Sequence, residues 1–239
     1  MSRWEQHVTE TTEDAKQFWA SSSLKTLFDM MDTPRWAWEA WLKVAAGVIT
    51  SPGEVFEPGC GIGLLAELLP ADCTYYGCDI NAGYIEQANS LHGGPGRRFE
   101  YRDLYDVIDS GATFDWVIVP SLFGMFPEDA TYELLRELWN CARKGMAITT
   151  INKRLFPMLR RLRFEFTAHD PDELSAAAKD LPGVGEVELH KGQEYRVFRG
   201  HHWQRGLALY VWRHRDADGA LGSAASPEGG TAEPERATS

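Results

Sequence analysis

Val55-Phe56-Glu57-Pro58-Gly59-Cys60-Gly61-Ile62-Gly63-Leu64 is the stretch that decides the fold of this chain. The apolar run 54–56 reads as a buried strand, and the run 64–69 reads as a helix that Pro70 stops. Strand, glycine turn and helix together form the opening of a βα unit of the nucleotide-binding type. The glycines allow positive φ and carry no Cβ, so a ligand can lie against the backbone at the start of the helix.

The spacing of the glycines narrows the class of ligand. Gly59, Gly61 and Gly63 are spaced G-x-G-x-G, whereas a dinucleotide turn is spaced G-x-G-x-x-G and holds pyrophosphate at the positive end of the helix. Leu64 stands where the third dinucleotide glycine belongs, and Glu57 precedes the turn. A carboxylate there would repel a phosphate but could pair with an ammonium group, so the stretch disfavours a dehydrogenase.

The stretch 57–63 resembles motif I, E/D-x-G-x-G-x-G, of the class I S-adenosylmethionine-dependent methyltransferases. The resemblance implies an α/β, Rossmann-like sheet of seven strands in the order 3-2-1-4-5-7-6, with the last strand antiparallel. Helices should cover both faces, and N-terminal helices should form a lid. It also implies S-adenosyl-L-methionine as cofactor and S-adenosyl-L-homocysteine as product. Glu57 would support the methionine part, and four residues would pass under it: Gly59, Cys60, Gly61 and Gly63.

A second acid follows the second predicted strand, at 74–79. Asp79 comes 22 positions after Glu57, and an acid at this place can accept both ribose hydroxyls through its two oxygens. Asp79 resembles the ribose-binding acid of the methyltransferases, and Ile80 could cover one face of the adenine. The alternative is a simple acid at a helix start, because Asn81 is a good cap for the helix that follows.

A third acid follows the third predicted strand, at 98–102. In the methyltransferases an acid here commonly binds the adenine amino group, which needs a hydrogen-bond acceptor. The resemblance therefore adds Asp103 and Leu104 to the cofactor site. Asp103 could instead be a turn residue, and Asp106 and Asp109 are nearby competitors for the role.

The fourth predicted strand, 114–119, should point its carboxyl end at the ligand crevice, which adds Pro120 to the cofactor site. Methyltransferases that act on exocyclic amines of DNA bases or on glutamine amides carry Asn/Asp-Pro-Pro-Tyr/Phe here. This chain has Val-Pro-Ser-Leu at 119–122, which disfavours those substrates. The remaining strands are predicted at 145–151, 185–190 and 207–212.

The chain divides into three predicted parts. Residues 1–47 form a helical lid or cap, in which Phe18 and Trp19 are the candidates to cover the ligand; the alternative is plain packing of amphipathic helices. Residues 48–215 form the cofactor-binding methyltransferase domain. Residues 216–239 have too few large apolar side chains to offset the entropy of ordering and are predicted to be a disordered tail.

Candidate bases for the methyl acceptor lie in the predicted connection 191–206, beside the crevice. They are His201, His202 and Tyr195, and His169 is a further candidate, although a histidine in a polar loop is often merely solvated. The histidines lack the i, i+4 spacing of a helical metal site, so no metal is predicted. A basic run at 153–163 is either a solvated helix face or a means of binding an acidic substrate.

The composition sets limits on the partners. The chain has 239 residues, 44% of them hydrophobic, and a formal net charge of −11, which suits one soluble domain with appendages and argues against nucleic acid or an anionic membrane surface as a partner. Four unpaired cysteines, no signal-peptide core and no long apolar run predict a cytoplasmic protein. A monomer or a homodimer is expected.

The leading hypothesis is a small-molecule methyltransferase that methylates oxygen or nitrogen of a metabolite or natural product, with an acidic or aromatic acceptor. Because the sulfonium of the cofactor is already a good leaving group, catalysis would consist mostly of positioning, with deprotonation where the acceptor needs it. Two alternatives stay open. One is an enzyme that uses the cofactor without methyl transfer, for example by intramolecular cyclisation that releases methylthioadenosine. The other is a non-catalytic cofactor-binding module.

Overall fold

The computed structural model describes residues 12–23, 35–152, 167–191 and 206–213. Three sets of predictions lie outside these residues: the basic run 153–163, the connection that carries Tyr195, His201 and His202, and the tail 216–239.

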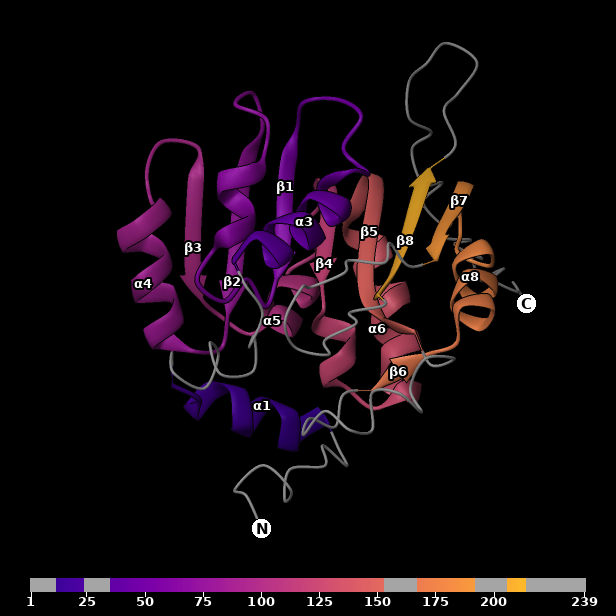
Figure 1. Cartoon of the computed structure of the whole chain (residues 1–239), viewed down its shortest axis with the longest axis horizontal. Helices are drawn as coiled ribbons and strands as arrows, with labels where there is room; N and C mark the ends of the chain where they lie inside the picture. The colour runs from indigo at the N-terminus through magenta and orange to yellow at the C-terminus, as the bar shows by residue number, and fades with distance from the viewer. Residues whose placement is uncertain (1–11, 24–34, 153–166, 192–205, 214–239) are drawn as a thin grey trace, which may run out of the picture.

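One sheet forms the centre of the molecule (Figure 1). Its strands are β1 Glu54–Pro58, β2 Thr74–Asp79, β3 Arg97–Tyr101, β4 Phe114–Pro120, β5 Ala142–Asn152, β6 Ala168–His169, β7 Val184–Lys191 and β8 Gly206–Arg213. The order is β3-β2-β1-β4-β5-β8-β7, and the two-residue β6 pairs with β5 off this path. Strand β8 is antiparallel to both of its neighbours, while the other pairs are parallel. The predicted order is therefore confirmed, with β7 and β8 as the sixth and seventh strands and β6 as an addition.

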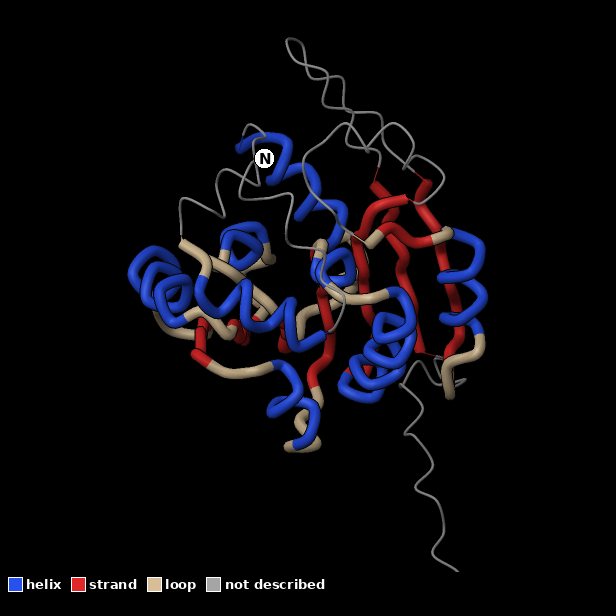
Figure 2. The backbone as a smooth tube through the Cα atoms, turned by 90° about the horizontal axis from the view of Figure 1, so that it is seen from below, coloured by secondary structure: helices blue, strands red, loops and turns tan. Residues whose placement is uncertain are grey.

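Helices cover both faces of the sheet (Figure 2). They are α1 Thr12–Ser21, α3 Arg35–Ala46, η1 Leu64–Leu68, α4 Ala82–His92, α5 Leu104–Asp109, η2 Leu122–Met125, α6 Glu128–Cys141 and α8 Pro171–Lys179. The elements α3, η1 and α4 supply one buried apolar cluster, and α5, α6 and α8 supply the other. The class predicted from the sequence, a Rossmann-like α/β fold, is the fold observed.

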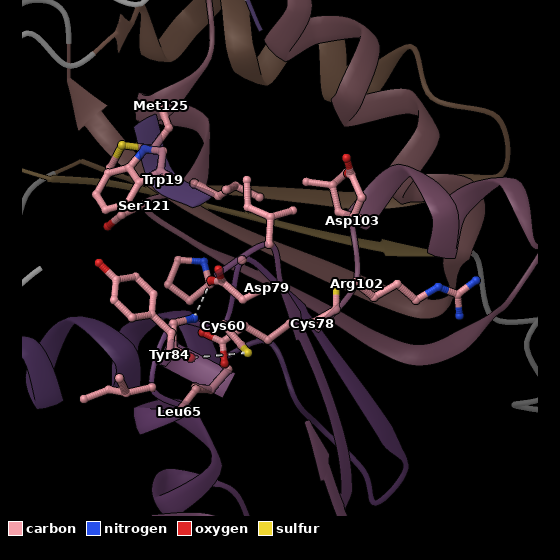
Figure 3. Close-up of a pocket in the computed structure, with 18 of the residues that line it drawn as sticks. Trp19, Cys60, Leu65, Cys78, Asp79, Tyr84, Arg102, Asp103, Ser121 and Met125 are labelled. Carbon is pink, nitrogen blue, oxygen red and sulfur yellow. Dashed lines mark hydrogen bonds between the residues drawn. The ribbon is translucent and has the colours of Figure 1, made fainter. Parts of the chain in front are cut away.

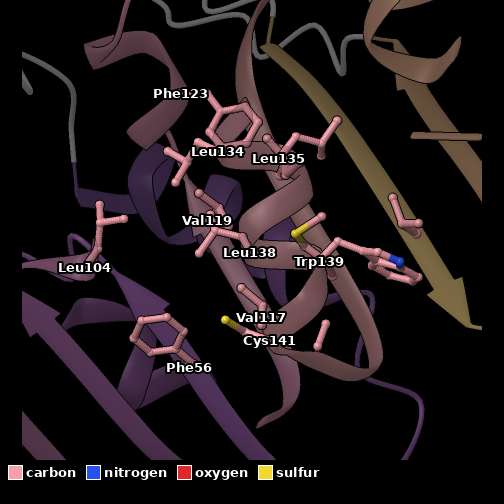
Figure 4. Close-up of a cluster of buried hydrophobic side chains, with 14 of the residues drawn as sticks. Phe56, Leu104, Val117, Val119, Phe123, Leu134, Leu135, Leu138, Trp139 and Cys141 are labelled. Carbon is pink, nitrogen blue, oxygen red and sulfur yellow. The ribbon is translucent and has the colours of Figure 1, made fainter. Parts of the chain in front are cut away.

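The two clusters follow from the two-residue period of the strands. In β1, Val55 belongs to the cluster with α3 and η1, and its neighbour Phe56 belongs to the cluster with α6. In β4, Ile118 and Val119 divide in the same way, because successive strand side chains point to opposite faces. Figure 4 shows the second cluster, in which Trp139 of α6 is fully buried. A continuous apolar run in the sequence thus becomes a strand that is covered on both faces.

Two local predictions differ from the structure. The run 64–69 forms the 3₁₀ helix η1 instead of an α-helix, because only a few residues separate the left-handed Gly63 from Pro70. The fifth strand, predicted to begin at residue 145, already begins at Ala142 as β5. Ala142 pairs with Phe114 there, and its carbonyl accepts a 2.7 Å hydrogen bond from Arg213 Nε.

Candidate functional site

A cavity of about 190 Å³ lies at the carboxyl ends of the central parallel strands (Figure 3). Ten of the eleven residues predicted to form the cofactor site line it: Trp19, Glu57, Gly59, Cys60, Gly61, Asp79, Ile80, Asp103, Leu104 and Pro120. The structure therefore brings together residues from the glycine turn, from three strand ends and from α1.

The exception is Gly63, which does not line the cavity. All three glycines of the turn have positive φ, but they differ in what surrounds them. A Cβ on Gly61 would meet no atom within 4 Å, whereas a Cβ on Gly63 would collide with the ring of Phe99. Gly63 is therefore required by packing between the turn and β3, while Gly61 leaves a bare stretch of backbone at the cavity.

Glu57 ends β1 as a buried acid, only 4% exposed. It accepts a hydrogen bond from the hydroxyl of Tyr75 on β2. The register explains this contact: Glu57 lies opposite Gly77, and Tyr75 extends along the same face of β2 across the space that Gly77 leaves open. A Cβ on Gly77 would lie 2.7 Å from the Tyr75 hydroxyl and 2.8 Å from Cys60 Sγ.

Burial changes the acidity of Glu57. Removal from water raises its pKa to about 8, against the lowering effect of the Tyr75 hydrogen bond, and the nearby Asp79 adds a smaller upward shift. At neutral pH Glu57 is therefore mostly the neutral acid when no cation lies beside it. A cation placed beside it would favour the ionised form.

Asp79 organises the backbone around the cavity. Its Oδ2 accepts a 2.9 Å hydrogen bond from the Gly61 amide, and its Oδ1 accepts a 2.8 Å bond from the Asn81 amide. Burial raises the pKa of Asp79, and these backbone donors act in the opposite direction. Each carboxylate oxygen has a second acceptor position, so the contacts inside the protein leave capacity for two hydroxyl donors.

Asp103 has structural partners of its own. It caps α5 by accepting from the Tyr105 amide (3.0 Å), and it forms a 2.7 Å ion pair with Lys16 of α1. The turn role considered for Asp103 is thus present alongside its place in the cavity wall. The competing acids Asp106 and Asp109 are exposed and do not line the cavity.

Helix α1 lies across the carboxyl end of the sheet (Figure 1) and closes the cavity there. Besides the Lys16 ion pair, the Asn81 side chain donates to the carbonyls of Trp19 (2.9 Å) and Ser22 (2.7 Å). The Tyr84 hydroxyl donates to the carbonyl of Ser23 (3.1 Å) and lies 2.7 Å from Ser22 Oγ. The sequence predicts Trp19 as a residue that covers the ligand, but it does not predict Lys16, Asn81 and Tyr84 as contacts of the covering helix. The one signal available was the spacing of Lys16 and Trp19, which places both on one side of a helix.

The end of β4 forms the remaining wall of the cavity. Pro120 is the one residue of this wall that the sequence predicts. Ser121 has a left-handed backbone with φ 59°, and it is the one non-glycine residue with positive φ in the described parts of the chain. Leu122, Met125 and Phe126, from η2 and its end, complete an apolar surface. The signal was their place directly after β4, but the residue types there do not show which side chains face inward.

None of the histidines among the described residues lines the cavity. His169 lies in β6, fully buried, with its Nδ1 3.0 Å from Thr150 Oγ1, and it does not line the cavity. The candidate bases His201, His202 and Tyr195 lie outside the described residues, so their role stays a prediction. No helix within the described ranges has the length and apolar character needed to span a bilayer.

Sequence comparison matches part of the chain to a known protein family. Residues 55–145 match the profile of a family described as a methyltransferase domain. This part of the chain is similar to a methyltransferase domain. The match begins in β1 and ends in β5, so it covers the glycine turn, the three strand-end acids and the end of β4. A comparison of the chain with curated proteins gives no match.

Solved methyltransferase structures share the fold of this domain. A SAM-dependent methyltransferase from Archaeoglobus fulgidus superposes with a TM-score of 0.64 at 14% identity, over 80% of this chain and 100% of that one. The plantazolicin methyltransferase BpumL in complex with SAH gives 0.62 at 13% identity, over 84% and 94%. The magnesium protoporphyrin IX methyltransferase from Synechocystis PCC 6803 with bound SAH gives 0.52 at 18% identity, over 74% and 80%.

Proposed function

We propose that the methyltransferase domain binds S-adenosyl-L-methionine and transfers its methyl group to an oxygen or nitrogen atom of a small molecule. The observation that carries the proposal is the cavity itself. Glu57, Asp79 and Asp103 end three neighbouring strands and line one cavity together with the bare backbone at Gly61. Fold neighbours that were solved with SAH support the choice of cofactor.

The acids suit the parts of this cofactor in a fixed order along the sheet. Asp79 has the capacity for both ribose hydroxyls, as derived above. Asp103, on the β3 side, offers an acceptor for the adenine amino group, and Ile80 and Leu104 offer apolar contact for the ring. Glu57, on the β1 side, offers a carboxyl group for the ammonium of the methionine part, which would stabilise its ionised form.

The chemical step needs little from the protein besides placement. A bond forms between the acceptor atom and the methyl carbon while the carbon–sulfur bond breaks, and its electron pair stays on sulfur. The products are the methylated acceptor and the neutral thioether S-adenosyl-L-homocysteine, and the acceptor loses its proton to water or to a base. Alignment of the two reactants in a closed cavity is therefore the main source of rate. In this proposal residues 1–47, which include α1, form a lid over the domain of residues 48–215, and residues 216–239 form a tail.

Titration calorimetry with S-adenosyl-L-methionine and S-adenosyl-L-homocysteine tests the cofactor. We expect the wild type to bind both and Asp79→Ala to lose at least a hundredfold in affinity, because hydrogen bonds to a charged group contribute about 1.5–3 kcal/mol each. Asp106→Ala is the matched control, since it removes an exposed acid outside the cavity. Absence of binding by the wild type would refute the proposal.

Product analysis tests the reaction. Incubation with S-adenosyl-L-methionine and a metabolite extract should release S-adenosyl-L-homocysteine and transfer label from the methyl group. Release of methylthioadenosine would instead identify the intramolecular cyclisation, and binding without turnover in any extract would identify a non-catalytic module. Location in the cytoplasm and a monomeric or homodimeric state stay predictions of the sequence.

A further inference from the structure

The β4 end of the cavity carries an unusual residue. Ser121 adopts a left-handed conformation that is energetically unfavourable for a non-glycine residue, and such residues gather at functional sites. The residue is fixed from its backbone, since its amide donates to the carbonyl of Thr149 at 2.8 Å. Its side chain does not cap η2, although it stands at the start of that helix. Local structure therefore does not explain why a serine is held in this way.

The hydroxyl of Ser121 is oriented by a partner outside the cavity. Trp41 Nε1 donates to Ser121 Oγ at 3.0 Å, and Trp41 itself does not line the cavity. A hydroxyl has one proton to donate, and no residue in the described parts of the chain accepts it. With the indole occupying one side of the oxygen, the proton is available toward the cavity that Ser121 lines.

The surroundings of Ser121 are apolar. Trp19, Leu122, Met125 and Phe126 line the cavity with it, and Figure 3 shows Trp19, Ser121 and Met125 at one end while Asp103 and Arg102 lie at the other. Of the charged residues in the wall, Lys16 and Asp103 are paired with each other. Asp79 accepts from two backbone amides, and Arg102 donates to the carbonyl of Asp106. An ionised molecule seated against the apolar end would lose hydration there, and Trp19, Leu122, Met125 and Phe126 offer it no counter-charge.

The order of the acids fixes which reactant lies at this end. With adenine near Asp103 and ribose at Asp79, the methionine part extends from β2 toward β1 and β4. The reacting methyl group would then face the wall that Pro120 and Ser121 form. The space beside Ser121 is consequently the place for the methyl acceptor.

We propose that Ser121 binds the methyl acceptor by donating a hydrogen bond to it, and that the acceptor is an uncharged, predominantly apolar or aromatic molecule. The proposal rests on the proposed function and adds its substrate class. It selects the aromatic acceptor over the acidic one. Ser121 is a binding residue for the acceptor, and Trp41 is a positioning residue that acts through it.

The test uses matched aromatic probes on the full chain saturated with S-adenosyl-L-homocysteine. Ligand-observed NMR titrations compare 2-naphthol, 2-naphthoate, 2-naphthylmethylammonium and 2-methylnaphthalene. We expect 2-naphthol to bind at least tenfold more tightly than either charged probe. Ser121→Ala should weaken 2-naphthol by about three- to tenfold, the range of one neutral hydrogen bond, and should leave 2-methylnaphthalene unchanged.

Two variants distinguish the effect of the Ser121 hydroxyl from the effects of its backbone conformation and of its partner Trp41. Ser121→Gly removes the hydroxyl but suits positive φ, so it should weaken 2-naphthol as Ser121→Ala does while it preserves or raises thermal stability. Trp41→Phe removes only the indole donor and should produce a smaller loss in the same direction. Affinity for S-adenosyl-L-homocysteine should stay within twofold of the wild type in all three variants.

The outcomes distinguish the two proposals. If the wild type binds S-adenosyl-L-homocysteine, three results overturn the acceptor assignment alone: equal binding of the charged probes, no saturable binding of 2-naphthol, or unchanged 2-naphthol affinity in Ser121→Ala and Ser121→Gly. A loss of S-adenosyl-L-homocysteine affinity in those variants would assign Ser121 to the cofactor and overturn it as well. If the wild type does not bind S-adenosyl-L-homocysteine, the proposed function fails and this inference fails with it.

Discussion

The two ends of the cavity are built in different ways. At the β1–β3 end, each acid comes directly from the end of a strand, and Asp79 joins the turn and the next helix through backbone amides. At the β4 end, the wall comes from η2 and from α1, and the Ser121 hydroxyl is held by Trp41 of α3, a residue 80 positions away in the sequence. The first end is made by local chain geometry and the second by tertiary contacts.

This difference distinguishes the cofactor site, which a family has in common, from the acceptor site, which depends on the substrate. A cofactor with ribose, adenine and ammonium groups needs acceptors at fixed spacing, and parallel strands provide that spacing through their common register. An acceptor molecule needs only a wall of suitable shape and polarity, which many sequences can supply. We therefore expect changes at the first end to alter folding and cofactor binding, and changes at the second to alter the choice of acceptor.

The largest effect should come from the buried acid at the first end. Glu57 has a folded-state pKa of about 8 against an ordinary value of 4.5, so between these values the folded protein holds a proton that the unfolded chain releases. Stability must then fall as pH rises, by up to about 1.4 kcal/mol per pH unit, and level off above pH 8. Urea denaturation at pH 5, 6.5 and 8 should show this fall in the wild type relative to Glu57→Gln, which keeps an acceptor for Tyr75. Parallel curves for the two proteins would contradict the protonation of Glu57.

The next effect concerns the two glycines that the turn uses differently. Gly63→Ala should lower the free energy of unfolding by about 3 kcal/mol, because positive φ and overlap with Phe99 both oppose the new Cβ. Gly61→Ala meets open space and should cost only about 1 kcal/mol for its conformation, while it impairs binding of S-adenosyl-L-homocysteine. Chemical denaturation and calorimetry on both variants give the comparison. Equal stability losses would show that the packing of Gly63 is not what distinguishes the pair.

A smaller effect should follow when the covering helix is released. Asn81→Ala removes the cap of α4 and the two bonds to α1, with an expected loss of about 1–2 kcal/mol. Asn81→Ser retains a capping oxygen and removes only the amide donors, so it should be nearly as stable as the wild type. In both variants amide hydrogen exchange in residues 12–23 should accelerate. Unchanged exchange in Asn81→Ser would mean that α1 is held by other contacts.

The smallest effect should come from Lys16→Met. The Lys16 and Asp103 side chains are each 26% exposed, and partly exposed ion pairs contribute about 0.5 kcal/mol. Urea denaturation should therefore show a change near that value, reduced further at high salt. A loss above about 1.5 kcal/mol would indicate that α1 depends on this pair more than on its contacts with Asn81 and Tyr84. Binding of 2-naphthol at the β4 end should not change.

Much of the first end could be predicted from the sequence. Strand, turn and acid recur in a fixed order, so the sequence alone predicts Glu57, Asp79 and Asp103 at one edge of the sheet. The partners of these acids could not, because the contact of Tyr75 with Glu57 depends on strand register. Gly63 was assigned to the ligand because spacing alone does not tell a glycine that faces a cavity from one that avoids Phe99.

Most of the second end could not be predicted from the sequence, because it too depends on contacts between segments that are far apart in the chain. The residue type at position 121 does not reveal the positive φ of Ser121, because serine usually avoids that conformation. The bonds from Asn81 and Tyr84 to α1 span about sixty residues and depend on how separate helices dock. Strand β6 has two residues, too few for any periodicity. The assignments of His201, His202 and Tyr195 stay predictions.

Gly77 carries a lesson for anyone who wishes to transplant this site. It touches no ligand space and would be missed by a survey of the cavity wall, yet the hydroxyl of Tyr75 and the thiol of Cys60 occupy the room that its absent methyl group leaves. A redesigned scaffold that copies the wall and puts alanine at this position would force the phenol away from Glu57. A glycine at this position of β2 therefore has to be retained together with the side chains of the cavity wall.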